Sequence, residues 1–204
     1  MLTGVSRFTL SGSGADSFEI FDATLRTAAI TITGGSGTGE TILGGSGADS
    51  IDGFGGADSI IAGTGNDTVV FYADGTTIDG GSGDIDWLQM ASGVSYMSGS
   101  SGLGRATGFE VLDASNAGAV TVVGSSGAET IYGGSGGNSI YGGSGGNSIY
   151  GGGDADDRII AGSGNDTITY ASGDTIDGGT GFDRLVIAGR LNTSDAADDG
   201  VGED

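Results

Sequence analysis

Apolar residues recur at nine-residue intervals along much of the chain, most of them two positions after an acid. Residues 44–70 hold three consecutive units of this form, 44–52, 53–61 and 62–70. Each unit has a glycine-rich first half, Asp at position six and Ile or Val at position eight. Glycine permits sharp turns. Positions seven to nine predict a short strand whose middle side chain points inward. The pattern therefore predicts an alternation of turn and strand.

Two such units would close one flattened coil, so that residues 18 positions apart lie above one another. Stacked coils in parallel pairing are separated by about 4.8 Å. We therefore predict an all-β fold, a parallel β-roll or β-solenoid. The alternative is that the Asp residues only cap turns, as Asp does well. That alternative does not account for the nine-residue regularity.

The second half of the chain repeats the first. Residues 161–168 echo residues 62–69, and residues 175–179 echo residues 77–81. This predicts a solenoid built from two duplicated arrays of nonapeptide repeats. The predicted division is a first array with lead-in coils (1–88), an irregular connecting segment (89–108), a second array (109–190) and an acidic, disordered tail (191–204). The connecting segment would be either a linker or a bulged coil.

The stacking brings acids together and indicates calcium. Asp49 and Asp67 would lie one coil apart on one edge, and Glu40 and Asp58 one coil apart on the other. Two carboxylates about 4.8 Å apart repel by roughly 1 kcal/mol in water and by more where screening is poor. Ca²⁺ takes six to eight oxygen ligands, which paired carboxylates and turn carbonyls can supply. The predicted ligands of several Ca²⁺ ions are Asp49, Asp58, Asp67, Asp86, Asp157, Asp166, Asp174 and Asp183.

Some units depart from the pattern at position six. Metal binding is left open at Glu40, Glu129, Asn138 and Asn147. Asn keeps an oxygen but loses the charge, so we expect the Asn units to bind calcium weakly or not at all. The tyrosines at the ends of neighbouring units, Tyr132, Tyr141 and Tyr150, are expected to form a row. That row would be ordinary stacking along the solenoid or, alternatively, a surface for a glycan or a partner.

Composition limits the function. The chain has 47 Gly, no Pro, no Cys and no His, and its net charge is −21. Such charge disfavours nucleic acid and anionic membranes as partners, and no stretch is apolar enough to insert into a membrane. The lack of His and Cys removes the usual catalytic groups, so we expect no enzyme. High charge could also mean disorder, so we expect a loose chain that calcium orders.

The repeats resemble the calcium-binding nonapeptide repeats of the repeats-in-toxin (RTX, haemolysin-type) exoproteins, most closely at residues 44–70 and 151–186. The resemblance implies a right-handed β-roll with calcium along both edges. It also implies type I secretion, with folding outside the cell. We therefore expect a secreted, extracellular or cell-surface structural protein that self-associates end to end into a surface layer or filament. The alternative is a secretion and folding module of a larger hydrolase, toxin or adhesin. A weaker alternative is an ice- or glycan-binding solenoid.

Overall fold

The strands are short and follow the nonapeptide units closely. The computed structural model describes residues 6–10, 20–36, 39–72, 77–83, 85–94, 96–98, 105–153 and 156–187. Within these residues there are 20 strands and no helix. The strands are β1 (Arg7–Thr9), β2 (Ile20–Asp22), β3 (Thr31–Thr33), β4 (Thr41–Leu43), β5 (Ser50–Asp52), β6 (Ser59–Ile61), β7 (Thr68–Phe71), β8 (Thr77–Asp79), β9 (Trp87–Met90), β10 (Tyr96–Ser98), β11 (Arg105–Thr107), β12 (Val111–Asp113), β13 (Thr121–Val123), β14 (Thr130–Tyr132), β15 (Ser139–Tyr141), β16 (Ser148–Tyr150), β17 (Arg158–Ile160), β18 (Thr167–Tyr170), β19 (Thr175–Asp177) and β20 (Arg184–Ile187).

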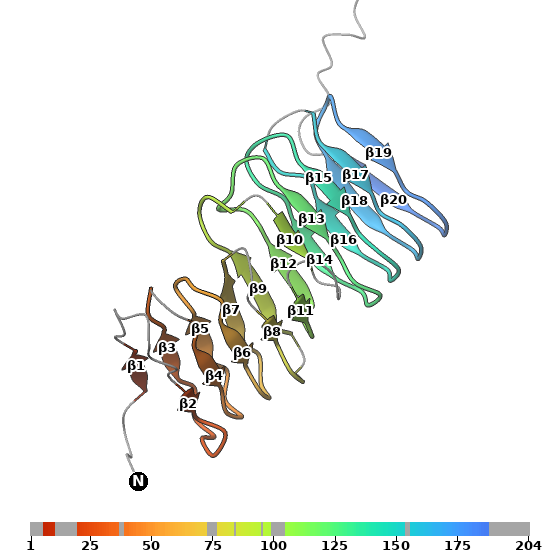
Figure 1. Cartoon of the computed structure of the whole chain (residues 1–204). Helices are drawn as coiled ribbons and strands as arrows, with labels where there is room; N and C mark the ends of the chain where they lie inside the picture. Colours follow the sequence, from red (N-terminus) through yellow and green to blue (C-terminus); the bar gives the residue numbers. More distant parts are fainter. Residues whose placement is uncertain are drawn as a thin grey trace, which may run out of the picture.

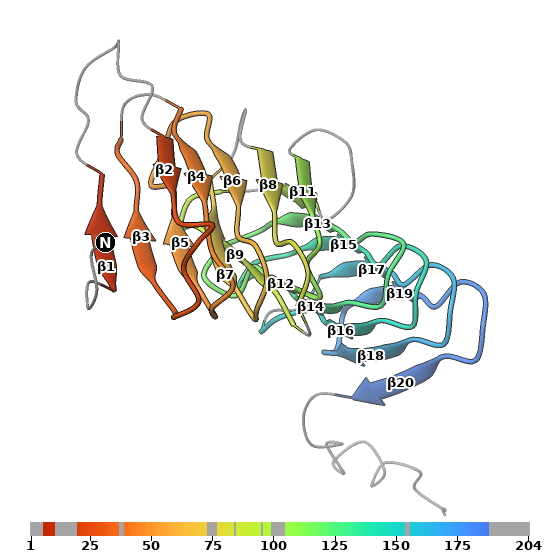
Figure 2. The ribbon, with the colours of Figure 1, turned by 90° about the horizontal axis from the view of Figure 1, so that it is seen from below.

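The strands stack into a parallel β-solenoid with two layers, which confirms the predicted fold class. One layer is a ten-stranded sheet in the order β1-β3-β5-β7-β9-β12-β14-β16-β18-β20. The other layer consists of two five-stranded sheets, β2-β4-β6-β8-β11 and β10-β13-β15-β17-β19. Figure 1 shows the coils following one another along the long axis, and Figure 2 shows the two layers face to face. All the strand pairs are parallel, as successive coils of one solenoid require.

The core consists of two columns of side chains, one from each layer, to which most strands contribute one residue and β7 and β9 contribute a second, Phe71 and Met90. The residue at position eight points between the layers, and the register places these residues directly over one another, as with Ile51 over Val69 and Ile140 over Ile159. Most of them are completely buried. Because the coil is flat, each layer contributes one column, and the two columns together make a thin but continuous core. This burial is the main stabilising term that does not depend on metal.

The middle of the chain departs from simple alternation between layers. β9 and β12 are neighbours in the ten-stranded sheet, with Trp87 opposite Val111. Between them the chain forms two strands of the other layer: β10, which pairs forward with β13, and β11, which pairs back with β8. The predicted division at residues 89–108 stays a prediction. In space, the ten-stranded sheet runs through that boundary without a break.

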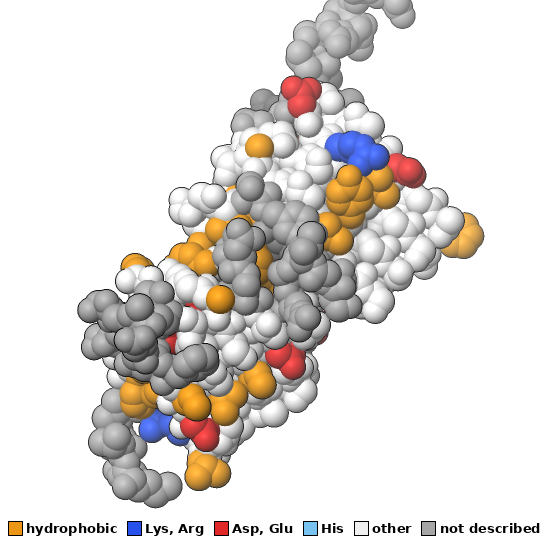
Figure 3. All heavy atoms as spheres, viewed as in Figure 1, with side chains coloured by type: hydrophobic (Ala, Val, Ile, Leu, Met, Phe, Trp, Pro, Cys, Tyr) orange, Lys and Arg blue, Asp and Glu red, His pale blue; other side chains and the backbone are white. Residues whose placement is uncertain are grey.

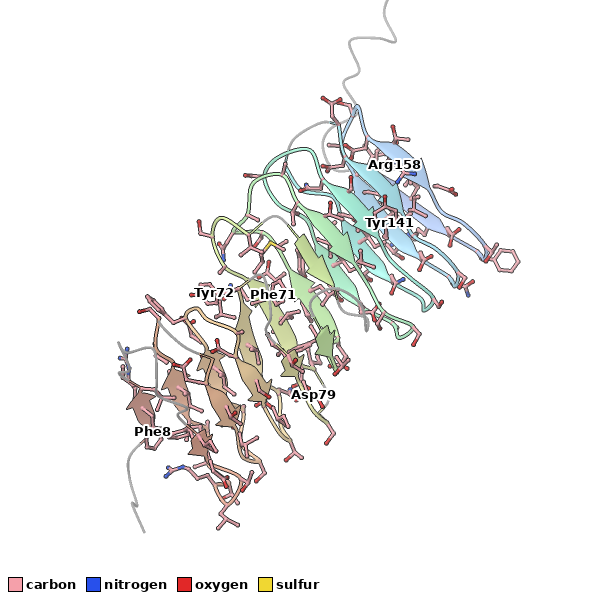
Figure 4. All side chains as sticks on the ribbon, viewed as in Figure 1. Phe8, Phe71, Tyr72, Asp79, Tyr141 and Arg158 are labelled. Atoms are coloured by element: carbon pink, nitrogen blue, oxygen red, sulfur yellow. The ribbon has the colours of Figure 1, made fainter. Side chains whose placement is uncertain are left out.

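The predicted tyrosine row is wrong in one member. Tyr132 and Tyr150 lie in the ten-stranded sheet and stack with their ring centroids 4.9 Å apart. Tyr141 lies in the opposite layer, where the guanidinium of Arg158 sits 5.6 Å from its ring centroid and donates a hydrogen bond to its hydroxyl. Figure 4 shows Tyr141 beside Arg158. Nine residues move the chain to the other layer, so only residues a whole coil apart can stack.

Candidate calcium sites

The residues at position six form two rows, one at the start of each layer's strands. The row leading into the ten-stranded sheet, here called the long row, contains Asp49, Asp67, Asp86, Glu110, Glu129, Asn147, Asp166 and Asp183. The row leading into the two five-stranded sheets, the short row, contains Glu40, Asp58, Asn138, Asp157 and Asp174. Most of these side chains are buried, although their neighbours at positions three to five are largely exposed. Accordingly, the face of the molecule shown in Figure 3 has only a few, separate Asp and Glu side chains.

Hydrogen bonds tie the members of each row together. The backbone N–H of Asp49 donates to Oδ1 of Asp67 at 2.7 Å, and the N–H of Asp67 donates to Oδ1 of Asp86 at 2.7 Å. In the short row the N–H of Glu40 donates to Oδ1 of Asp58 at 3.0 Å. The same bond joins Asp157 to Asp174 and Asp166 to Asp183, each at 3.0 Å. The side chain at position six therefore clamps the preceding coil, and the predicted same-edge pairs lie together.

The second carboxylate oxygen has no such partner in several members. The buried oxygens without a hydrogen bond include Oε2 of Glu40, Oδ2 of Asp58, Oδ2 of Asp67, Oε2 of Glu129 and Oδ2 of Asp166. A buried ionised oxygen without a partner is costly, by several kcal/mol or more in a dry environment. Native proteins rarely leave such groups unpaired unless a ligand or ion completes them. These oxygens are therefore the strongest structural sign of a bound cation.

Turn carbonyls supply further oxygens beside the acids. The turns of neighbouring coils approach so closely that a Cβ built on Gly44 would lie 1.9 Å from the carbonyl oxygen of Ala62 and 3.0 Å from Oδ2 of Asp49. The same crowding occurs on the opposite edge, where a Cβ on Gly53 would lie 2.5 Å from Oδ2 of Asp58. Only glycine leaves the space between the coils free. An ion there would meet carboxylate and carbonyl oxygens together.

Burial and mutual repulsion disfavour the charged form of these acids. Burial, with smaller contributions from the carboxyl of Asp58, raises the pKa of Glu40 to about 7. Burial also raises the pKa of Asp67 to about 6. The hydrogen bond from the N–H of Asp49 lowers this pKa, whereas the charges of Asp49 and Asp86 raise it further. The pKa values of Asp58 and Asp86 are likewise raised, chiefly by burial. A cation beside these acids would offset the cost that burial places on their charged form.

The donor set fits Ca²⁺. The available atoms are all oxygens, and a hard cation with flexible coordination is bound by carboxylates and backbone carbonyls. In the described part of the chain no three or more His, Cys, Asp or Glu side chains gather into a group that could hold a metal by themselves. A cation beside these acids would therefore take further oxygens from backbone carbonyls, such as that of Ala62 at the Gly44 turn.

Other acids have a different role, at position nine. Oδ1 of Asp52 accepts the N–H of Phe54, two residues on. Asp79, Asp113 and Asp177 accept in the same way from the residue two positions later. These Asx turns start the bend at the end of a strand. Asx turns thus belong to position nine. The acids at position six lie in the rows, although Asp49 and Asp174 also accept one N–H of their own turn, from Gly45 and Ala171.

The structure gathers all eight predicted ligand residues into the two rows; their metal binding stays a prediction. One member was missed: Oε2 of Glu110 accepts the N–H of Asp86 at 2.8 Å. The signal was present, since Glu110 stands two residues before the inward Leu112, but its turn lacks the repeat glycines. The acidic tail predicted at residues 191–204 lies outside the described residues.

The parallel β-solenoid, its two rows of buried acids and its glycine turns define a repeat protein with candidate calcium sites. The family model for the RTX calcium-binding nonapeptide repeat (4 copies) matches residues 34–69, 123–156 and 169–186. The chain therefore carries RTX calcium-binding nonapeptide repeats, as the sequence predicts. A comparison with curated proteins gives no match. The described residues include no helix able to cross a membrane.

Proposed function

We propose that the chain is an exported structural protein that folds on calcium outside the cell, with no catalytic activity of its own. The buried carboxylate oxygens without a hydrogen-bond partner, as at Asp58, Asp67 and Asp166, carry this proposal. In low calcium the rows repel and the coils are loose. In extracellular calcium the ions bridge successive coils and the solenoid closes. Coupling of this kind makes the binding free energy part of the folding free energy.

A titration followed by circular dichroism and calorimetry tests this. Ca²⁺ should convert a largely unordered chain into a β-rich one, with Kd on the order of 10⁻⁴ M, the extracellular range. Mg²⁺ should do so far less well, because it is smaller and demands near-ideal octahedral geometry. A chain that is fully ordered after exhaustive chelation, with no heat of calcium binding, would contradict the proposal.

Self-association is the second part of the proposal, and the ends of the solenoid support it. Within the described residues, β20 pairs on one side only, with β18, and β1 pairs only with β3. At the β20 end Leu185 and Ile187 are each 52% exposed, although Leu185 continues the core column above Ile168. An open strand edge is a template for pairing. We propose that copies of this chain stack there into filaments or a layer.

Electron microscopy and sedimentation in calcium test the stacking. Leu185→Lys places a charge on the open end and should leave isolated particles where the parent chain forms filaments. Ile61→Lys is the matched control, since Ile61 is 46% exposed on the outer side of β6, away from both ends. Isolated particles from the parent chain, or equal effects of the two substitutions, would count against end-to-end assembly.

The second candidate is a calcium-dependent secretion and folding module of a larger type I-secreted hydrolase, toxin or adhesin. The same exposed end favours it, because an adjoining domain could cover Leu185 and Ile187. Attaching a well-folded reporter enzyme to the chain distinguishes the two functions. A module should couple secretion and refolding of the reporter to calcium while the chain remains monomeric. A structural protein should assemble whether or not a reporter is attached.

A further inference from the structure

The amide of Asn138 occupies the place where the pattern expects an ion. Its Nδ2 lies 3.0 Å from the carbonyl oxygen of Gly134, 2.9 Å from that of Gly151 and 3.0 Å from Oδ1 of Asp157. Two turn carbonyls and the carboxylate of the next coil are the kinds of oxygen that surround the other position-six residues. Here they converge on a nitrogen that donates protons.

The orientation of this amide is fixed by the groups around it. Oδ1 of Asn138 accepts the N–H of Val120 at 3.0 Å and that of Gly134 at 3.3 Å. Turning the amide over would set its nitrogen against two N–H donors and its oxygen against three oxygens. The hydrogen-bond network therefore assigns the two atoms without ambiguity. The side chain is 2% exposed, so these bonds form out of water, where each is worth more than at the surface.

Asn147, one unit later, gives a contrast within the same chain. Its Oδ1 accepts the N–H of Glu129 at 2.9 Å, as the row requires. Its Nδ2 is buried and has no hydrogen-bond partner. The two asparagines therefore share the clamp to the preceding coil, but only Asn138 binds the oxygens on both sides of the gap.

The coils around Asn138 also carry less buried negative charge than the coils of the first array. Between residues 120 and 151 the three position-six residues are Glu129, Asn138 and Asn147, with one acid among them. Oε1 of Glu129 accepts both the hydroxyl and the N–H of Ser125 in its own turn. The stacked rings of Tyr132 and Tyr150 add an attraction between successive coils, worth about 0.5–1.5 kcal/mol beyond the burial of their area.

We propose that Asn138 is a built-in replacement for a calcium ion in the short row, so that β13, β15 and β17 stay joined without metal and seed the calcium-dependent coils on both sides. This inference rests on the proposed calcium function for the rest of the chain. Its physical basis is that an amide NH₂ bridges two coils without the charge repulsion that the acids create. A solenoid folds by adding coils to an existing one, so a metal-free centre would let both arms grow as soon as calcium is available.

Hydrogen exchange of the whole chain, in chelator and in calcium, tests the proposal. In chelator the amides of β13, β15 and β17 should exchange at least tenfold more slowly than those of β3–β7. Equal exchange in the two regions overturns the proposal. The proposed calcium function fails in a different way, namely if β3–β7 gain no protection when calcium is added.

Substitutions at the two asparagines sharpen the test. Asn138→Asp sets an oxygen against three oxygens, so protection of β15 and β17 in chelator should fall at least tenfold, and calcium should restore it with one more ion bound. Asn138→Ala should lose the protection without rescue by calcium. Asn147→Asp, which removes no hydrogen bond of Nδ2, should lower the protection in chelator much less. An Asn138→Asp variant that keeps its protection in chelator, or equal losses at both asparagines, overturns the assignment.

Discussion

The backbone N–H of Asp49 donates a 2.7 Å hydrogen bond to Oδ1 of Asp67, which lies one coil further along the solenoid. The carboxylate of Asp67 therefore has two separate tasks. Its Oδ1 holds the preceding coil in register, and its buried Oδ2 has no hydrogen-bond partner. The first task needs an oxygen, whereas the second needs a cation. Substitutions can separate them.

Replacing Asp67 by Asn should keep the clamp and remove the charge. In chelator the variant should be more stable than the parent chain, by about 1 kcal/mol, because one buried repulsive carboxylate has gone. In saturating calcium it should be less stable and bind fewer ions. The ordered fraction from circular dichroism in chelator and urea unfolding in calcium measure these two effects. Asp67→Ala is the companion variant: it loses the hydrogen bond to Asp49 as well and should lose about 1.5–3 kcal/mol in calcium, the value of a bond to a charged group. An Asp67→Asn variant that responds to calcium like the parent chain would contradict the assignment of the Asp67 carboxylate to a calcium site.

Acid should partly replace calcium. Burial raises the pKa of Glu40 to about 7 and that of Asp67 to about 6. The folded chain without metal therefore binds more protons than the unfolded chain between about pH 4 and pH 7, so its free energy of unfolding must rise as the pH falls through that window. The chelated protein should be markedly more ordered at pH 5 than at pH 7.5. The measurement is far-ultraviolet circular dichroism in chelator across the range. Calcium should be needed most at pH 7.5, and an apo chain that loosens between pH 7.5 and pH 5 would contradict the raised pKa values.

The sequence predicted the parts of the fold that follow from the nine-residue repeat. Position eight is an inward aliphatic residue in unit after unit, and an 18-residue coil places Asp49 beside Asp67 whatever the details of the turn. Tyr141 was misplaced because it is adjacent to the other tyrosines in the chain, while stacking depends on whole coils. The detour through β10 and β11 was not predictable, because residues 89–108 lack the repeat glycines and strand pairing there is decided by long-range packing.

The sequence predicted the members of the two rows wherever the residue types of the nonapeptide identify them. Glu110 was missed because a longer acid without a preceding glycine turn does not match the nonapeptide. The exchange of roles at Asn138 required the three-dimensional positions of Gly134 and Gly151, since its spacing is identical to that of the acids. Sequence thus located the row, and only the hydrogen bonds set the amide of Asn138, which binds oxygens of two turns, apart from the acids.

Glycine at position one should be necessary for the coils to approach. A Cβ on Gly44 would lie 1.9 Å from the carbonyl oxygen of Ala62, which is backbone and cannot rotate away. Gly44→Ala should therefore force the turns apart and cost about 1–3 kcal/mol, as overpacking does, with a loss of calcium affinity. Gly118→Ala is the control, because nothing lies within 4 Å of its Cβ position. Thermal unfolding in calcium measures both, and equal effects of the two would contradict the close approach.

Loss of one acid in the second array should act locally. Asp166 clamps Asn147 through Oδ1, which accepts the N–H of Asn147 at 2.7 Å, and its own N–H donates to Asp183. Asp166→Ala should therefore loosen β16, β18 and β20 more than β3, β5 and β7, since in a solenoid each coil contacts only its neighbours. Hydrogen exchange in calcium resolves the two regions in one sample. Asp49→Ala is the mirror variant and should reverse the pattern. If both variants raise exchange equally along the whole chain, the solenoid unfolds as one unit and the pairing of acids by neighbouring coils does not set its local stability.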